Sequence, residues 1–257
     1  LVNTLRETIR IPSPTGSERE MGEYCARRMR AMGLEVMEVT QRQESPNFIG
    51  RLSGKGPGVT LCFHAHIDTV PPGDPANWTK DPFGGLLDNG YVYGRGACGV
   101  KNDIAVMLSV AEILAARKNE WQGNLVLCFA SCEETADPVG TQHAIDSGLL
   151  DDVDFAIVGE QTECGIVIAH RGGAHFKITV QGESAHSSIA DHAGINSIHK
   201  MSLIIDAIHK NYLPTLKRRS HPYLPSPVAN VAIIQGGIKP NMVPDHCEMI
   251  MDRRMLP

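Results

Sequence analysis

The chain has 257 residues, 42% of them hydrophobic and 21% charged, a composition that indicates a globular protein with its own core and excludes a disordered or fibrous chain. A net charge of −5 argues against nucleic acid as the main partner. No apolar run reaches the roughly 18–20 residues that a membrane-spanning helix needs, so we expect no membrane partner. Seven cysteines, an odd number without a C-x-x-C pair, predict reduced thiols in a cytoplasmic protein.

The first part of the chain predicts alternating helices and strands. Ser17 and Glu20 have the spacing of a capping box in front of a helix. Residues 103–116 place apolar side chains at helical spacing, and short apolar runs predict buried strands. The expected strands are 34–40, 59–63, 125–130 and 155–158. We therefore expect an α/β domain in which helices sandwich a mixed, largely parallel sheet.

The pattern changes near Gly165. A helix over 195–210 then lies among strands in the order β-α-β-β, which is most of a ferredoxin-like α+β unit. The expected strands here are 166–169, 174–181, 228–235 and 246–252. We expect residues 1–169 to form the first domain and residues 170–257 the second. Because the chain stops just after a strand-like run, we also expect the second domain to be truncated at its C-terminal end.

Metal-binding side chains follow the strand predicted at 59–63. His64, His66 and Asp68 alternate there, so an extended chain points all three to one side. An imidazole can bind zinc through one nitrogen while a carboxylate holds its other N–H. Ligands also gather at the carboxyl ends of strands in α/β sheets. This segment therefore predicts a metal site.

Acidic residues follow two further predicted strands. Glu133 and Glu134 come after strand 125–130, and Glu160 comes after strand 155–158. Adjacent carboxylates in an extended chain point opposite ways, so one can bind a metal while its neighbour acts as a general base toward water. Taken alone, the pair is a weak signal, because adjacent glutamates are common on solvated surfaces, and Glu160 alone favours a helix-cap or surface role.

Together the motifs resemble the co-catalytic zinc aminoacylase and carboxypeptidase family, which includes acetylornithine deacetylase, succinyl-diaminopimelate desuccinylase and glutamate carboxypeptidase. The resemblance covers nearly the whole chain. The segments that carry it are HAHIDTVPPGD at 64–74, YGRGACGVK at 93–101, CEE at 132–134, VGEQT at 158–162, RGG at 171–173, AHSS at 185–188 and GGIKPNMVPDHCEMIMDRR at 236–254. It implies a zinc-peptidase-like fold with an inserted lid domain that forms a homodimer. It also implies one or two zinc ions, with cobalt or manganese as replacements.

The resemblance assigns roles in the first domain. It implies that His66 and Glu160 bind one zinc ion and that Glu134 binds the second. Asp68 orients His66, and Glu133 is the general base. His64 is not a ligand on this match, and we expect it either to be packed or to support a ligand from behind.

The resemblance also assigns roles in the second domain. His186 resembles the residue that reaches the partner subunit's active site and steadies the oxyanion. Arg171, Asn241 and Arg254 resemble residues that hold the substrate's carboxylate and carbonyl. Arginine suits this task because its planar guanidinium meets a carboxylate bidentately.

The chain departs from the family pattern at several ligand positions. The pattern G-R-G-x-x-D-x-K carries an aspartate that bridges both zinc ions, and Gly99 stands at that position. Asp103 lies four residues further on, at a helix start. Cys132 replaces the aspartate before the two glutamates, and Gln161 replaces the proline after the metal-binding glutamate. The last histidine ligand would lie beyond Pro257. We therefore expect one weakly bound metal ion or none.

Two hypotheses follow. The first is a metal-dependent hydrolase that cleaves the amide bond of N-acyl amino acids or small peptides, with impaired activity because of Gly99. The alternative is a non-catalytic, small-molecule-binding relative on the same scaffold. The H-x-H-x-D segment alone also resembles metallo-β-lactamases, which would need a histidine where Thr69 stands. It resembles (β/α)8 amidohydrolases too. Their eightfold strand–helix repeat does not fit the β-α-β-β order that follows Gly165 in this chain.

Overall fold

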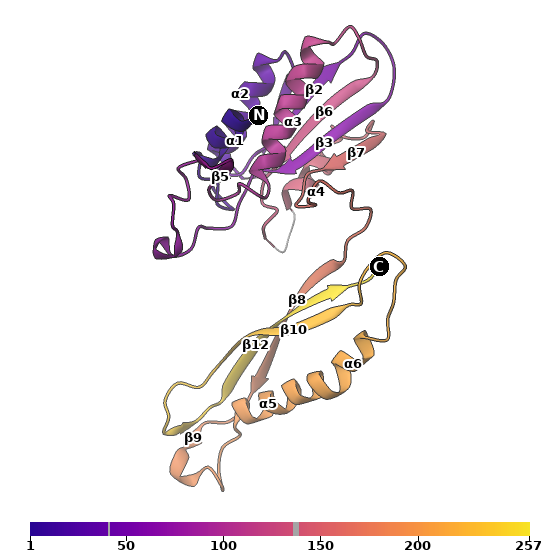
Figure 1. Ribbon diagram of the computed structural model, residues 1–257. Helices are drawn as coiled ribbons and strands as arrows, with labels where there is room; N and C mark the ends of the chain where they lie inside the picture. The colour runs from indigo at the N-terminus through magenta and orange to yellow at the C-terminus, as the bar shows by residue number, and fades with distance from the viewer. Residues whose placement is uncertain (41, 136–138) are drawn as a thin grey trace. The chain divides into compact units, whose positions relative to one another are not determined.

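The computed structural model describes residues 1–40, 42–135 and 139–257. It divides into two compact units, residues 1–165 and 166–257, each with a sheet of its own (Figure 1). The domain boundary expected from the sequence followed residue 169. Over the described ranges, no helix is both long and apolar enough to cross a membrane.

The first unit is built on a five-stranded sheet of order β1-β2-β6-β3-β7. Strand β3 is parallel to its neighbours β6 and β7, and β2 is antiparallel to both β1 and β6. Four of these five strands therefore run in one direction, which confirms the mixed, largely parallel sheet. The strands are β1 (Glu35–Val39), β2 (Asn47–Ser53), β3 (Thr60–His66), β6 (Asn124–Ala130) and β7 (Phe155–Val158).

Helices cover both faces of this sheet (Figure 1). They are α1 (Val2–Ile9), α2 (Arg19–Ala31), α3 (Lys101–Ala116) and α4 (Val139–Asp146). Side chains alternate across a strand, so Phe63 joins the large core under α2 and α3, while Cys62 joins the smaller core under α4. Burial on both faces explains why β3 and β6 appear as continuous apolar runs in the sequence, whereas the edge strand β7 is exposed.

Two sequence expectations for the first unit need correction. Strand β2 was not predicted, and it lies antiparallel between β1 and β6. The capping box is wrong, because α2 begins at Arg19 and Glu18 stands at its N-cap without a side-chain cap. The carboxylate of Glu18 is instead buried against other loops. The stretch between β3 and α3 holds a 3-10 turn, η1 (Pro75–Asn77), and a hairpin of β4 (Leu86–Asp88) and β5 (Tyr91–Tyr93).

The second unit is an antiparallel sheet of order β10-β12-β8, with α5 packed on one face. Met201 of α5 is fully buried against Val180, Cys247 and Met249 of the sheet. Residues 166–169 form no strand, and Ile166 is 93% exposed, because this segment has no pairing partner. The elements are β8 (Gly172–Gln181), β9 (Ala185–His186), η2 (Ser187–Ile189), α5 (Ser197–Ala207), η3 (Ile208–Tyr212), α6 (Leu213–Leu216), β10 (Val228–Gly236), β11 (Met242–Val243) and β12 (His246–Met255).

Candidate metal-binding and catalytic site

The site candidates of the first unit lie at one edge of its sheet. Strands β3, β6 and β7 are parallel neighbours, so their carboxyl ends meet there. The chain continues the pairing just past these ends, since Ile67 N donates to Ala130 O (2.8 Å) and Gly159 N donates to His64 O (2.8 Å). Asp68, the pair at 133–134 and residue 160 therefore emerge side by side.

Asp68 is the buried centre of the site. Its side chain is fully buried and accepts four hydrogen bonds. The donors are Thr15 Oγ1 (2.7 Å), His66 Nδ1 (3.2 Å), Glu133 N (3.0 Å) and Glu134 N (3.0 Å). Burial alone would raise the pKa of Asp68, but these hydrogen bonds hold it below its usual value. Asp68 thus stays charged and orients both the imidazole and the loop of the two glutamates.

His66 turns its two ring nitrogens toward different carboxylates. Nδ1 meets Asp68, and Nε2 lies 3.8 Å from Glu133 Oε2. Burial would lower the pKa of His66, but the hydrogen bond to Asp68 and the charges of Asp68, Glu133 and Glu160 outweigh it and raise the pKa. The carboxylates therefore favour a positive charge at this position, which a metal cation bound at Nε2 would also supply.

Glu133 is a half-buried carboxylate among like charges. Burial raises its pKa, and repulsion by Glu160, Glu134 and Asp68 adds to the rise, while His66 opposes it. A carboxylate with a raised pKa is a better proton acceptor than one in open solvent. The environment of Glu133 therefore suits a general base.

A second buried carboxylate, Glu18, supports the same loop. It accepts hydrogen bonds from Ser45 Oγ (2.6 Å) and from Cys132 N (3.1 Å). Cys132 has a left-handed φ of 57°, which is costly for a residue with a side chain, so the contacts around it must hold that conformation. Glu18 and Asp68 together bind three consecutive backbone N–H groups, those of residues 132–134. Sequence reasoning missed Glu18, and no local pattern marks it.

His64 lies away from this cluster, as expected. Its Nε2 lies 3.1 Å from Thr141 Oγ1 of α4. Burial lowers the pKa of His64 to about 4, so the ring is neutral at physiological pH. It belongs to the packing between the sheet and α4.

The candidate zinc ligands of the first unit do not form a complete metal-binding set among the described residues. His66 Nε2 and the carboxylate of Glu160 are typical zinc ligands, and the negative charge of Glu160 contributes to the raised pKa of His66. In the described part of the chain, no three His, Cys, Asp or Glu side chains are already arranged as a set that could hold a metal ion. Gly99 contributes no ligand, and the Gln161 side chain occupies the space beside it.

In the second unit, His186 and Asn241 lie at one end of the sheet. His186 of β9 pairs with Met242 of β11, and Ser187 N donates to Asn241 O (3.0 Å). His186 Nδ1 also lies 2.8 Å from Ser188 Oγ, which fixes one ring nitrogen and leaves Nε2 available.

Arg171 and Arg254 lie at the opposite end of the same sheet. Arg171 directly precedes β8, and Arg254 of β12 stands opposite Gly173. Ten residues of β8 at about 3.3 Å each separate this end from the His186 end by about 30 Å. Asn241 thus lies near His186 and far from Arg171 and Arg254. Arg254 Nε donates to Asp252 (3.0 Å), and Arg171 Nη1 donates to Ser226 O (3.0 Å).

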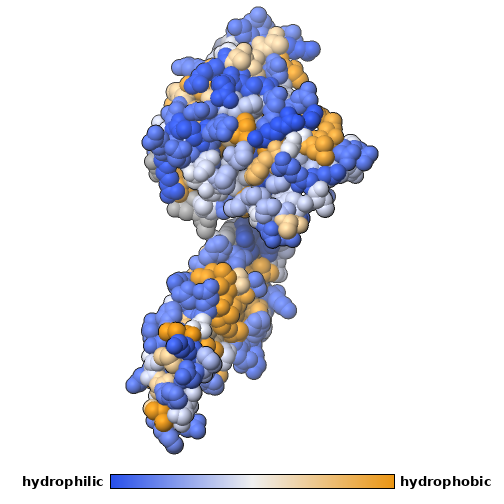
Figure 2. Space-filling model, turned by 90° about the vertical axis from the view of Figure 1, so that its left-hand side faces the viewer, coloured by the Kyte–Doolittle hydropathy of each residue, from blue (hydrophilic) through white to orange (hydrophobic). Residues whose placement is uncertain are grey.

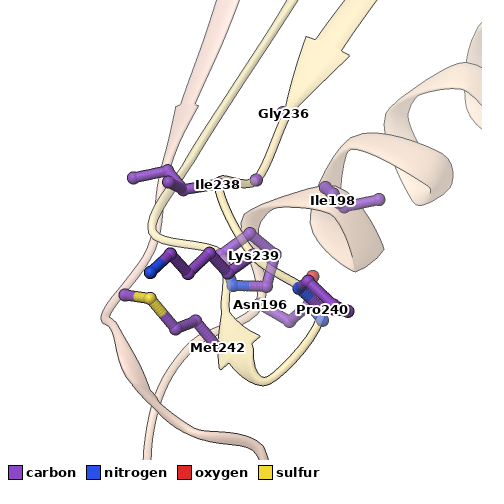
Figure 3. Close-up of a pocket in the computed structure, with 9 residues that line it drawn as sticks. Asn196, Ile198, Gly236, Ile238, Lys239, Pro240 and Met242 are labelled. Carbon is purple, nitrogen blue, oxygen red and sulfur yellow. The ribbon is translucent and has the colours of Figure 1, made fainter.

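A surface hollow of about 440 Å³ borders the loop that carries Asn241. It lies between the start of α5 and the segment that joins β10 to β11 (Figure 3). Ile198 lines it from the helix, Lys239 from the segment, and Met242 from the start of β11. The hollow therefore belongs to the His186 end of the second unit.

Comparisons with known proteins match the two units separately. Residues 47–164 match the model of peptidase family M28, and residues 168–257 match the M20-type peptidase dimerisation domain. The chain is 26% identical over 249 residues to a succinyl-diaminopimelate desuccinylase of Marinobacter nauticus, covering 94% of this chain and 64% of that protein. It is 30% identical over 225 residues to a succinyl-diaminopimelate desuccinylase of Buchnera aphidicola, covering 82% and 59%. The chain thus spans about three fifths of the length of these curated relatives.

Solved structures share the fold at lower identity. An M20 family metallo-carboxypeptidase from Sulfolobus solfataricus superposes with a TM-score of 0.81 at 19% identity, covering 99% of this chain and 71% of that one. An aminopeptidase from Bacillus cereus gives a TM-score of 0.74 at 24% identity, covering 100% and 66%. The fold is that of the M20 metallopeptidases. The resemblance inferred from the motifs is confirmed, and the chain is related to the succinyl-diaminopimelate desuccinylases by sequence.

Proposed function

We propose that the protein is a metal-dependent hydrolase that cleaves the amide bond of N-acyl amino acids or small peptides. The main support is the cluster at the sheet edge, where His66 Nε2 faces Glu133 and the charge of Glu160 acts on both. Relatives named as desuccinylases and metallo-carboxypeptidases support the same reaction class. We place the protein in the cytoplasm, where its seven thiols stay reduced.

In this proposal, His66 and Glu160 hold a zinc ion, for which cobalt or manganese can substitute, and Glu134 offers a further carboxylate. When bound, such a cation polarises a carbonyl group and lowers the pKa of water. Glu133 accepts a proton from the attacking water on its carboxylate and passes it to the leaving amine. Asp68 keeps Nε2 of His66 aimed at the site by accepting from Nδ1.

The second unit supplies the substrate contacts and the dimer. His186 steadies the oxyanion, and Arg171, Asn241 and Arg254 hold the substrate's carboxylate and carbonyl. Because Arg171 and Arg254 lie about 30 Å from His186 along the sheet, one copy of the unit can serve two sites in a homodimer. Figure 2 shows exposed apolar residues on this unit, and Val228, Ile233 and Ile234 of the edge strand β10 are about half exposed. Such a surface suits a subunit interface.

The glycine at position 99 supports a second candidate function, that of a non-catalytic binding protein. A chain that lacks the metal-bridging aspartate could still bind the carboxylate group of a substrate in its second unit without catalysing hydrolysis. Ligand binding in the absence of metal and of turnover would favour this non-catalytic relative. We favour the hydrolase with impaired turnover, because Glu133, His66 and their support by Asp68 are all present.

The test is Glu133→Gln in the full chain loaded with zinc, assayed on N-acetyl and N-succinyl amino acids. We expect hydrolysis to fall by about 10²–10⁴-fold while zinc content stays unchanged, since the carboxamide cannot accept the proton. Glu44→Gln, an exposed glutamate in the same unit, is the matched control and should keep full activity. Equal activity in Glu133→Gln and the control would refute the assignment.

A further inference from the structure

The backbone that carries the two site glutamates is held by side chains from other segments. Strand β6 ends at Ala130, and the next four backbone N–H groups, those of residues 131–134, each donate to a side-chain oxygen. Asn47 accepts from the first of them, Glu18 from the second, and Asp68 from the last two. Three side chains that are distant along the chain therefore set the course of this backbone.

Asn47 differs from the two carboxylates because its side chain also donates. Its Oδ1 accepts from Ser131 N (2.9 Å) and Ser131 Oγ (3.1 Å), while its Nδ2 donates to Gly140 O (2.8 Å) in the first turn of α4. An ionised carboxylate only accepts, so it could not make both kinds of contact. Asn47 is 2% exposed, and a buried backbone group that loses its partner is costly. One amide thus ties the end of β6 to the start of α4.

Gly140 lets α4 begin directly against Ser131. A Cβ atom built on Gly140 would overlap with the O atom of Ser131 and would lie 2.8 and 2.9 Å from its C and N atoms. These are backbone atoms, so the rotation of a side chain cannot relieve the contact. Residues 131 and 140 therefore touch, and Glu133 belongs to the segment whose two ends they form.

We propose that Asn47 is a positioning residue for the reaction, which holds Glu133 where its carboxylate faces His66. It does so by tying together Ser131 and Gly140, the two ends of the segment that carries Glu133. His66 Nε2 lies 3.8 Å from Glu133 Oε2, and a displacement of about 1 Å can slow a reaction by about 100-fold. This inference rests on the proposed function, because it concerns the general base of that reaction.

The first test is hydrogen exchange in the metal-free chain. In Asn47→Ala, the amide protons of residues 132–134 should exchange at least about tenfold faster than in the wild type, relative to those in the middle of β6, because their segment is released at both ends. Asn124→Ala is the matched control. The Asn124 side chain also accepts one hydrogen bond, from Ser53 Oγ, and donates one, to Thr60 Oγ1, but it stands at the opposite end of β6.

The control should leave the exchange of residues 132–134 unchanged relative to the middle of β6. If Asn47→Ala also left it unchanged, the inference would be overturned whether or not the protein is a hydrolase.

The second test uses kinetics to separate positioning from stability, at a temperature at which every variant is folded. Asn47→Ala should lower kcat by about 10–100-fold and change KM by less than about threefold, since no substrate contact is removed. In a Glu133→Gln chain, the same substitution should change kcat by less than about twofold, because no base is left to misplace. Asn124→Ala should keep full kcat in the wild-type chain.

The outcomes distinguish the two proposals. An equal loss of kcat in both backgrounds, or no loss in either, would overturn the role of Asn47 and leave the hydrolase intact. Full activity of Glu133→Gln itself would overturn the proposed function.

Gly140→Ala disturbs the same tie without changing Asn47, and it serves if Asn47→Ala does not fold. We expect it to lower kcat by about 10–100-fold, since its Cβ pushes the start of α4 away from Ser131. The double variant Asn47→Ala/Gly140→Ala should lose no more than either single variant, because both break one tie. Full kcat in folded Gly140→Ala would count decisively against the inference.

Discussion

Asp68→Asn is the substitution that most directly tests how the site is built. Asparagine has the shape of aspartate, so packing is preserved and only charge and hydrogen-bonding capacity change. The Asp68 carboxylate accepts from His66 Nδ1 and Glu133 N on one oxygen, and from Thr15 Oγ1 and Glu134 N on the other. The carboxamide can keep the partners of one oxygen only and turns its NH₂ toward the others.

The expected loss of stability follows from these four contacts. The Thr15 hydroxyl can rotate to another acceptor, but the Glu134 N–H is fixed and would be left unsatisfied, at a cost of about 1–3 kcal/mol. The two remaining hydrogen bonds change from charged to neutral acceptors, which weakens each by about 1 kcal/mol. Together we expect Asp68→Asn to lower the free energy of unfolding by about 3–5 kcal/mol.

Urea unfolding at pH 7 in the absence of metal measures this difference. Asp74→Asn is the matched control, because Asp74 is exposed and accepts one hydrogen bond, from Ala76 N, which asparagine can keep. We expect the control to change stability by no more than about 0.5 kcal/mol. If Asp68→Asn cost no more than the control, the view of Asp68 as the buried centre of the site would be wrong. Zinc affinity should also fall by about 10–100-fold.

Three further predictions concern residues around the site and in the lid. Glu18→Gln should destabilise the chain by about 2–3 kcal/mol in the same urea assay, whereas exposed Glu20→Gln should cost less than about 1 kcal/mol. Burial lowers the pKa of Lys101 to about 8. Between pH 8 and 10.5 the unfolded chain therefore binds more protons than the folded chain. As pH rises through that window, the free energy of unfolding of the wild type should increase by up to about 3 kcal/mol relative to that of Lys101→Met. A difference in the free energy of unfolding that does not change with pH would contradict the lowered pKa of Lys101. His186→Ala should lower kcat by about 10²–10³-fold and leave Tm unchanged. An unaltered kcat would show that His186 does not stabilise the oxyanion.

Lys101 shows why a buried amine can be tolerated. Its Nζ donates to the backbone oxygens of Thr8 (2.8 Å), in the last turn of α1, and of Ile11 (2.5 Å), just past the end of that helix. The Lys101 side chain is fully buried. A neutral amine has two N–H donors for these two acceptors, so deprotonation leaves every donor satisfied. The sequence shows a lysine near a helix start and nothing of this environment, because the acceptors lie about 90 residues away.

Sequence periodicity predicted most of the elements because burial imposes it. Strands β3 and β6 are covered on both faces and therefore consist of apolar runs, and helix α3 was predicted to within two residues of its start. Strand β2 was missed because Asn47, Gly50 and Arg51 interrupt its apolar pattern, and it is held by pairing on both edges. Residues 166–169 have strand-like composition but no partner, and pairing rather than composition makes a strand.

The sequence by itself determined where the candidate ligands occur, directly after buried strands, because the carboxyl ends of parallel strands share one edge of a sheet. Only the tertiary structure decided which groups support them. Glu18 reaches Cys132 across 114 positions of the chain, and Gln161 reaches Gly99 from another loop. Contacts between loops depend on the packing of the whole unit and leave no local period, so the filled space at Gly99 became visible only once the chain was folded.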